Sequence, residues 1–147
     1  MDAIDRRILQ ELSADGRLTN LALAGRVGLS PSACLRRVQE LERKGIITGY
    51  RAVVDPKAAG RALVVYVAIS LSEHTKAAQA AFERRIEPAE EVRECHNVTG
   101  AFEYLLRVEA EDLAAYKRFH TEVLGTIPAV RQITSYIVMG SAKDARA

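Results

Sequence analysis

Apolar positions in the first fifty residues repeat with the period of an α-helix, in three short runs separated by polar turn residues. The apolar side chains that share one face of each run are Ile4, Ile8, Leu9 and Leu12, then Leu21, Ala24 and Val27, then Cys34, Val38 and Leu41. Short amphipathic helices pack these faces together because none can bury its own face alone. The pattern therefore predicts a three-helix bundle in residues 1–48.

The join between the second and third predicted helices has the residues of a tight turn. Gly28 can adopt the positive φ that ends a helix. Ser30 can cap the next helix by accepting a hydrogen bond from a free N–H group, and Pro31 suits the first helical position. Gly45 then ends the third helix. Two helices joined by a short glycine-containing turn predict a helix-turn-helix.

The polar face of the third predicted helix favours DNA as a partner. Arg36 and Gln39 lie almost opposite the apolar face, and arginine and glutamine pair bidentately with guanine and adenine edges in the major groove. The candidate DNA-binding residues are Ser30, Ser32, Arg36, Arg37, Gln39 and Arg43. A solvated amphipathic helix is the alternative, and the preceding turn and helix favour binding to double-stranded DNA over it.

The charge of the chain supports this assignment only locally. Of the 147 residues, 48% are apolar and 27% are charged, which is typical of a globular protein, and the net charge is only +2. Residues 26–51 nevertheless hold six basic and two acidic side chains. A positive field concentrated on one segment is what a phosphate-docking surface requires.

The segment that follows the bundle changes character. Residues 47–54 are β-prone, and Asp55 and Pro56 end the run. We expect a strand and linker over residues 49–61, in either a winged or a hinge arrangement.

Residues 62–140 have the alternating pattern of a second domain. Strands are predicted over residues 63–71, 92–99, 104–110 and 130–139, with helices capped by Thr75 and Asp112 between them. The order βαββαβ predicts a ferredoxin-like domain, so the whole chain is of the α+β class, with a short tail over residues 141–147. Helices cover one face of such a sheet, and the other face is expected to be apolar and to pair with a second copy of the chain.

Nothing in the sequence indicates secretion or a membrane. The N-terminus is acidic and enters a helical pattern directly, and the longest apolar run, near residues 62–69, is too short to span a bilayer. Cys34 and Cys95 are far apart and outside any CxxC pair, as expected for free thiols in a reducing compartment. A cytoplasmic protein is the expectation.

The chain resembles the Lrp/AsnC family of bacterial regulators over residues 2–140. The matching residues are Asp5-Arg6-Arg7-Ile8-Leu9, Asp15-Gly16-Arg17, Leu23-Ala24, Val27-Gly28-Leu29-Ser30, Arg37-Val38, Leu41-Glu42, Gly45-Ile46-Ile47-Thr48-Gly49-Tyr50, Val98-Thr99-Gly100-Ala101-Phe102-Glu103-Tyr104-Leu105-Leu106 and Val130-Arg131-Gln132-Ile133-Thr134-Ser135. The chain departs from the family at Ala22, where an acid would complete a capping box, and at Glu103, where the family usually has Asp. The resemblance implies a transcriptional regulator that forms homodimers and higher oligomers and binds amino acids through its C-terminal domain.

The turn that precedes the third predicted strand is the candidate effector site. Gly100 lets backbone N–H groups approach a carboxylate closely, and Glu103 can pair with an ammonium group. The candidate effector-binding residues are Thr99, Gly100, Glu103, Gln132 and Thr134. A plain hairpin turn with a surface glutamate is the alternative reading of the residues themselves.

No catalytic constellation is visible, and we do not expect an enzyme. His74, His96 and His120 lie outside any metal-ligand spacing, and no phosphate-binding glycine loop occurs, so neither a metal nor a cofactor is expected beyond the amino-acid effector. Two functions remain open. One is a sequence-specific regulator that responds to an amino acid, and the other is an effector-independent architectural protein that wraps DNA.

Overall fold

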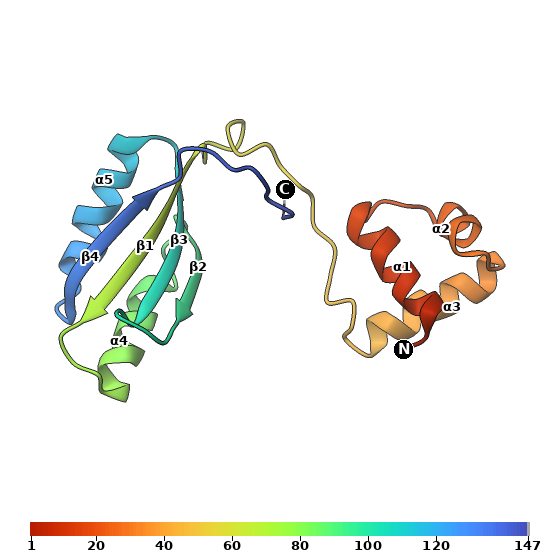
Figure 1. Cartoon of the computed structure of the whole chain (residues 1–147), viewed down its shortest axis with the longest axis horizontal. Helices are drawn as coiled ribbons and strands as arrows, with labels where there is room; N and C mark the ends of the chain where they lie inside the picture. Colours follow the sequence, from red (N-terminus) through yellow and green to blue (C-terminus); the bar gives the residue numbers. More distant parts are fainter. Residues whose placement is uncertain (147) are drawn as a thin grey trace. The chain divides into compact units, whose positions relative to one another are not determined.

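Three helices make up the N-terminal part of the computed structural model, which describes residues 1–146. They are α1 (Ala3–Ala14), α2 (Asn20–Val27) and α3 (Pro31–Arg43) (Figure 1). The side chains of Asp2, Thr19 and Ser30 cap them by accepting hydrogen bonds from backbone N–H groups of the first turn. The predicted helix starts at Thr19 and Ser30 are therefore confirmed. The contacts of the chain divide it into two units, Met1–Ala52 and Val53–Ala147, which are described separately below.

The three helices share one hydrophobic core. Its buried residues are Ile8, Leu23, Ala24, Val27, Cys34 and Leu41. The prediction that Leu21 faces this core is wrong, because its side chain is 71% exposed and Leu23 is buried in its place. The buried side of α2 runs along Leu23, Ala24 and Val27, and a rotation of about 100° per residue carries Leu21 away from that side.

The strand predicted within residues 47–54 does not form, and residues 48–55 have no regular secondary structure. The backbone N–H groups of Ile46 and Ile47 donate to Leu41 O at the end of α3, and the Tyr50 hydroxyl donates to Glu42 at 2.8 Å. Val53 and Val54 are exposed. A β-prone segment becomes a strand only when a neighbouring strand accepts and donates its backbone hydrogen bonds, and the described chain places none beside this one.

The second unit is built on a four-stranded antiparallel sheet. Its elements are β1 (Leu63–Leu71), α4 (Lys76–Ile86), β2 (Val92–Asn97), β3 (Tyr104–Ala110), α5 (Leu113–Glu122), a short 3-10 turn η1 (Leu124–Thr126) and β4 (Val130–Ile137). The strand order is β2-β3-β1-β4, so the predicted ferredoxin-like βαββαβ topology is confirmed. β2 and β4 each end two residues earlier than predicted, β2 because the turn that contains Gly100 begins there.

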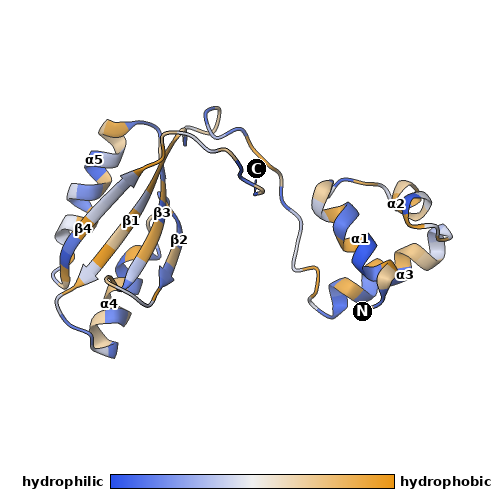
Figure 2. Cartoon of the chain, viewed as in Figure 1, coloured by the Kyte–Doolittle hydropathy of each residue, from blue (hydrophilic) through white to orange (hydrophobic). Residues whose placement is uncertain are grey.

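Both helices pack on one face of this sheet (Figure 1). The core beneath them is formed by alternate residues of the two central strands, including Val65, Val67 and Ile69 of β1 and Leu106 and Val108 of β3. Hydrophobic residues are concentrated along these two strands (Figure 2). The alternation of side chains along a strand places the intervening residues on the face without helices.

The face without helices is less apolar than predicted. Val64, Tyr66 and Ala68 of β1 face this side, as does Leu105 of β3. Arg107 of β3, paired with Tyr66, lies beside them and is buried. Arg107 Nη1 donates to Glu109 at 2.7 Å, and Arg107 Nε lies 3.9 Å from Glu94. The sheet therefore presents an apolar strip bordered by ion pairs. We call this surface the open face. No helix in residues 1–146 is long and apolar enough to cross a bilayer.

The left-handed conformation of Gly28 can be tested by substitution. Gly28 has φ of 72°, and a Cβ atom added there would meet nothing within 4 Å, so Gly28→Ala introduces backbone strain without a clash. We expect a loss of about 1 kcal/mol or more from the free energy of unfolding. Gly25 lies within α2, and a Cβ atom there would also meet nothing within 4 Å. Gly25→Ala should therefore be neutral or stabilising. Denaturant unfolding of both variants, followed by circular dichroism, measures the difference, and equal stability of the two would contradict this account.

Candidate functional site

The outer side of α3 carries a stripe of polar side chains at positions 32, 36, 39 and 43. Ser32, Arg36, Gln39 and Arg43 are all exposed, while Cys34 and Leu41 on the opposite side are buried. Residues separated by three, four or seven positions lie on one helical face. The structure therefore brings these four predicted DNA-binding residues together on one surface. Ser30 stands at the start of the same helix, where its hydroxyl caps Ala33 N at 3.3 Å.

Two of the predicted arginines already have carboxylate partners. Arg43 makes two hydrogen bonds to Glu40, at 2.8 and 2.7 Å, and Lys44 Nζ lies 3.2 Å from the same carboxylate. These two cations lower the pKa of Glu40 to about 2, with Arg43 the larger cause. Glu40 is therefore ionised at neutral pH and offsets part of the positive charge at the end of α3.

Arg37 connects α3 to the start of α1. Its Nη1 atom lies 2.8 Å from Asp2 Oδ2 and 2.9 Å from Asp5 Oδ1, and its side chain is 30% exposed. The pKa of the Asp2 carboxyl is lowered, first by the backbone N–H of Asp5 and then by Arg37. Arg37 thus holds two helices together through charge-assisted hydrogen bonds, a role that the sequence pattern did not indicate.

Of the six predicted DNA-binding residues, Ser32, Arg36 and Gln39 have the fewest side-chain contacts within the described chain. Neither Arg36 nor Gln39 forms a side-chain hydrogen bond or an ion pair within residues 1–146, and Ser32 has only a long contact of 3.4 Å to Ser30. The turn that places them is held by Asn20, whose Nδ2 donates to Pro31 O at 2.7 Å. The exposed donors on α3 are therefore presented by a helix whose first turn is fixed.

The candidate effector turn spans residues 98–103. Val98 N donates to Glu103 O at 2.9 Å and closes it, and Asn97 Nδ2 donates to the same oxygen at 3.1 Å. Gly100 has φ of 123°, a conformation that L side chains rarely adopt, so this position requires glycine. Thr99 and Gly100 are both exposed. The turn therefore presents backbone to solvent where the sequence predicted it.

The Glu103 carboxylate is held on both oxygens. Oε2 accepts a hydrogen bond from the backbone N–H of Leu71 at 2.9 Å. Oε1 lies 2.8 Å from His74 Nδ1, and only 16% of the Glu103 side chain is exposed. Sequence reasoning missed His74 because the contact crosses from the loop after β1 to the turn before β3. Pairing of β1 with β3 creates that contact, and no local pattern signals it.

Gln132 and Thr134 lie on the other side of β1 from Glu103. In the register of β1 with β4, Ser70 faces Gln132 and Ala68 faces Thr134. Glu103 borders β1 from the opposite edge, through its backbone N–H bond to Ile69 O at 3.0 Å. Two strand spacings, about 10 Å, separate the backbones concerned. Within the single chain, the structure thus groups Thr99, Gly100 and Glu103 and leaves Gln132 and Thr134 apart.

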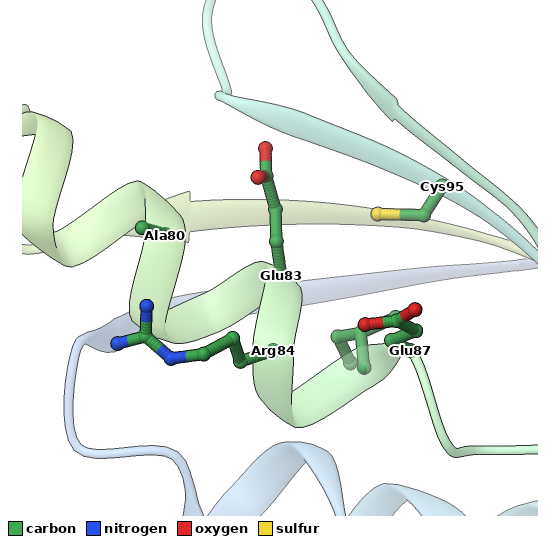
Figure 3. Close-up of a pocket in the computed structure, with 6 residues that line it drawn as sticks. Ala80, Glu83, Arg84, Glu87 and Cys95 are labelled. Atoms are coloured by element: carbon green, nitrogen blue, oxygen red, sulfur yellow. The ribbon is translucent and has the colours of Figure 1, made fainter.

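A surface hollow of about 450 Å³ lies between α4 and β2 (Figure 3). Its lining residues are Ala80, Glu83, Arg84, Ile86, Glu87 and Cys95. Burial, and after it the Glu83 carboxylate, raises the pKa of the Cys95 thiol to about 11. A thiol that stays protonated at neutral pH is a poor nucleophile and a poor metal ligand. In residues 1–146, no group of three or more His, Cys, Asp or Glu side chains is arranged to hold a metal ion.

Each of the two units matches a model of a known protein family. A family model described as "Winged helix-turn-helix DNA-binding" matches residues 1–48, and one described as "Lrp/AsnC ligand binding domain" matches residues 64–147. The chain belongs to the Lrp/AsnC family. It is a DNA-binding transcriptional regulator with a ligand-binding domain, as the resemblance implied.

The similarity of this Lrp/AsnC regulator to its relatives extends over nearly the whole chain. The leucine-responsive regulatory protein of Escherichia coli (strain K12) is 42% identical over 98% of this chain and 88% of that protein. A transcriptional regulator from Neisseria meningitidis, solved as a complex with L-Met, has a TM-score of 0.93 and 35% identity, covering 98% of this chain and 93% of that one. AsnC of Escherichia coli has a TM-score of 0.88 and 28% identity, covering 98% and 95%.

Proposed function

We propose that Arg36, Gln39 and Ser32 read base edges in the major groove when this regulator binds its operator. The proposal is supported by the exposure of these side chains on the outer side of α3, where Arg36 and Gln39 have no polar partner among the described residues. A helix-turn-helix places its second helix in the major groove, and arginine and glutamine there form bidentate pairs with guanine and adenine. Ser30, Arg37 and Arg43 are proposed to contact the phosphate backbone, which positions α3 without reading sequence.

The proposed effector is a free α-amino acid that binds at the turn over residues 98–103. Glu103 supplies the anion that an ammonium group needs, and the L-Met complex of the Neisseria meningitidis regulator supports this class of ligand. Gln132 and Thr134 remain candidates for a second contact. Because they lie across β1 from Glu103, they would contact a longer ligand or a ligand shared with a second copy of the chain.

The proposed assembly is a homodimer formed through the open face, which then associates into higher oligomers. Val64, Tyr66, Ala68 and Leu105 supply the apolar strip, and Arg107 with Glu109 supplies the charges that border it. A self-complementary face that pairs across a two-fold axis also presents two copies of α3 to DNA. The proposed location is the cytoplasm, where a bacterial regulator meets its DNA.

An architectural DNA-wrapping protein is the second candidate function. The charge distribution favours it only in part, because Glu40 pairs with Arg43 and Lys44 and reduces the basic surface at the end of α3. Protection of a few spaced sites in a footprint would support the regulator, whereas protection independent of sequence would support the architectural protein.

Arg36→Ala tests base reading. We expect this variant to lose about 1–3 kcal/mol of binding free energy on the specific site and much less on random DNA. Arg37→Ala should weaken both kinds of binding similarly, and it should also lower the thermal midpoint, because Asp2 and Asp5 lose their shared partner. Arg118→Ala on α5 removes the same charge outside the helix-turn-helix and serves as the control. Fluorescence anisotropy measures the affinities, and equal losses by Arg36→Ala on both DNAs would exclude it from base reading.

Glu103→Gln tests the effector site. A thermal-shift screen of the wild type against the twenty amino acids should identify at least one that raises the midpoint, because a ligand specific for the folded state stabilises it. Glu103→Gln should lose that shift and keep wild-type affinity for DNA in the absence of ligand. Glu111→Gln, on an exposed position before α5, is the matched control. If Glu103→Gln kept the full ligand-induced rise in thermal midpoint, Glu103 would have only a structural role in the turn.

Leu105→Glu tests the open face. Leu105 is half-buried at the centre of the apolar strip, so a carboxylate there should disfavour burial against a second copy. We expect the wild type to sediment as a dimer or larger species at micromolar concentration and Leu105→Glu to shift toward monomer. Leu113→Glu, at an exposed position on α5, is the control for an added charge. A wild-type monomer in sedimentation velocity, or an unchanged Leu105→Glu oligomer, would rule out this interface.

A further inference from the structure

His74 is the residue that the tertiary structure adds to the effector site. It precedes Thr75, whose hydroxyl caps α4 by accepting a hydrogen bond from Ala78 N at 3.1 Å. The imidazole is 76% exposed and lies 2.8 Å from Glu103 Oε1, whereas the Glu103 side chain is only 16% exposed. The exposed ring therefore borders the mostly buried carboxylate, and a ligand that binds Glu103 meets His74 beside it.

Glu103 is held by several hydrogen bonds, whereas the exposed His74 side chain has one contact. The Glu103 carboxylate accepts from Leu71 N at 2.9 Å, and its backbone N–H donates to Ile69 O at 3.0 Å. Its carbonyl accepts from both Val98 N and Asn97 Nδ2. His74 is exposed, and within residues 1–146 its side chain contacts only Glu103 as a polar partner. A ligand that binds Glu103 can therefore displace the ring by rotation of the His74 side chain, without a change in the sheet.

The head group of an α-amino acid places two opposite charges close together. Its ammonium and carboxylate groups are attached to one carbon atom, so the residues that bind them must lie within a few ångströms of each other. Gln132 and Thr134 stand across β1, about 10 Å from the Glu103 backbone. His74 already lies beside Glu103, and an imidazole N–H donates to a carboxylate in the neutral and the protonated ring alike.

We propose that Glu103 and His74 together recognise the zwitterionic head of a free α-amino acid, with Glu103 binding the ammonium group and His74 binding the α-carboxylate. The single contact between the two side chains is then replaced by two contacts to the ligand. His74 becomes the residue that selects free amino acids over related amines that lack the α-carboxylate. This inference rests on the proposed amino-acid response and specifies its chemistry.

The test compares each of the twenty L-amino acids with its α-amide, which keeps the ammonium group and loses the negative charge. Thermal shift identifies the ligands, and isothermal titration calorimetry of the full chain then measures the affinities. We expect the wild type to bind its amino acid about tenfold or more tightly than the amide. His74→Ala should bind the two within about threefold of each other, through weaker binding of the free acid. His74→Gln keeps an N–H donor and should restore part of the preference.

His96→Ala is the matched control, because His96 is also exposed, at 60%, and its Nε2 lies 3.8 Å from a glutamate, Glu94. It should keep the wild-type preference. If His74→Ala kept the preference for the free amino acid over its amide, the proposed role of His74 would be overturned. If His74→Ala bound both the acid and the amide more tightly than the wild type, the ring would only shield Glu103, which would also overturn the role. If no amino acid shifts the wild type, the proposed amino-acid response itself fails, which is a result distinct from either of these.

Discussion

The pairing of β1 with strands on both of its edges is the constraint on which the ligand-binding domain depends. β3 lies along one edge and β4 along the other, so every residue of β1 faces either the helices or the open face. Val65, Val67 and Ile69 consequently pack beneath α4 and α5 and form the centre of the core. The β1–β3 ladder ends at the pair Ile69–Tyr104, so the backbone N–H of Leu71 lies beyond it and donates to Glu103. Gln132 and Thr134 pair with the other edge of β1.

The polar side chains of α3 form two groups: those paired with a carboxylate of the same chain and those without such a partner. Arg37 is used to join α3 to α1, and Arg43 is paired with Glu40. Arg36 and Gln39 are left without partners among the described residues. This division follows from helix geometry, because neighbouring positions point about 100° apart, so one arginine reaches the bundle and the next faces solvent. Base reading is therefore proposed for the side chains without a partner, and phosphate contact for the paired ones.

A regulator couples its two binding events, and the size of that coupling is bounded. Linkage between an effector and DNA is typically worth about 1–3 kcal/mol, and it changes each affinity by the same factor. Each unit of this chain has its own hydrophobic core. If the proposed assembly forms, a ligand at the turn over residues 98–103 can affect DNA binding by changing how copies of the chain associate. Such a change requires that the ligand bind one assembly state more tightly than the other.

The sequence by itself determined the helix starts, the strands of the second unit and the family. Caps at Thr19, Ser30, Thr75 and Asp112 predicted helix starts, because a capping side chain acts on N–H groups two or three residues away and is visible locally. The alternating pattern of residues 62–140 predicted the four strands, and the order of the motifs predicted the Lrp/AsnC assignment. The sequence predicts the positive φ of Gly28, whereas it marks Gly100 only for close backbone approach to a ligand, and the structure adds its φ of 123°.

Only the tertiary structure decided which distant residues meet. The β-prone segment near residues 47–54 stayed without regular structure, because strand formation depends on a neighbour and not on propensity alone. The contacts of Arg37 with Asp2 and Asp5, and of His74 with Glu103, join residues that no periodicity relates. Strand order likewise placed Gln132 and Thr134 apart from Glu103. Local patterns specify how each element begins, turns and ends, whereas the chemistry of a site depends on through-space contacts that exist only once the elements have packed.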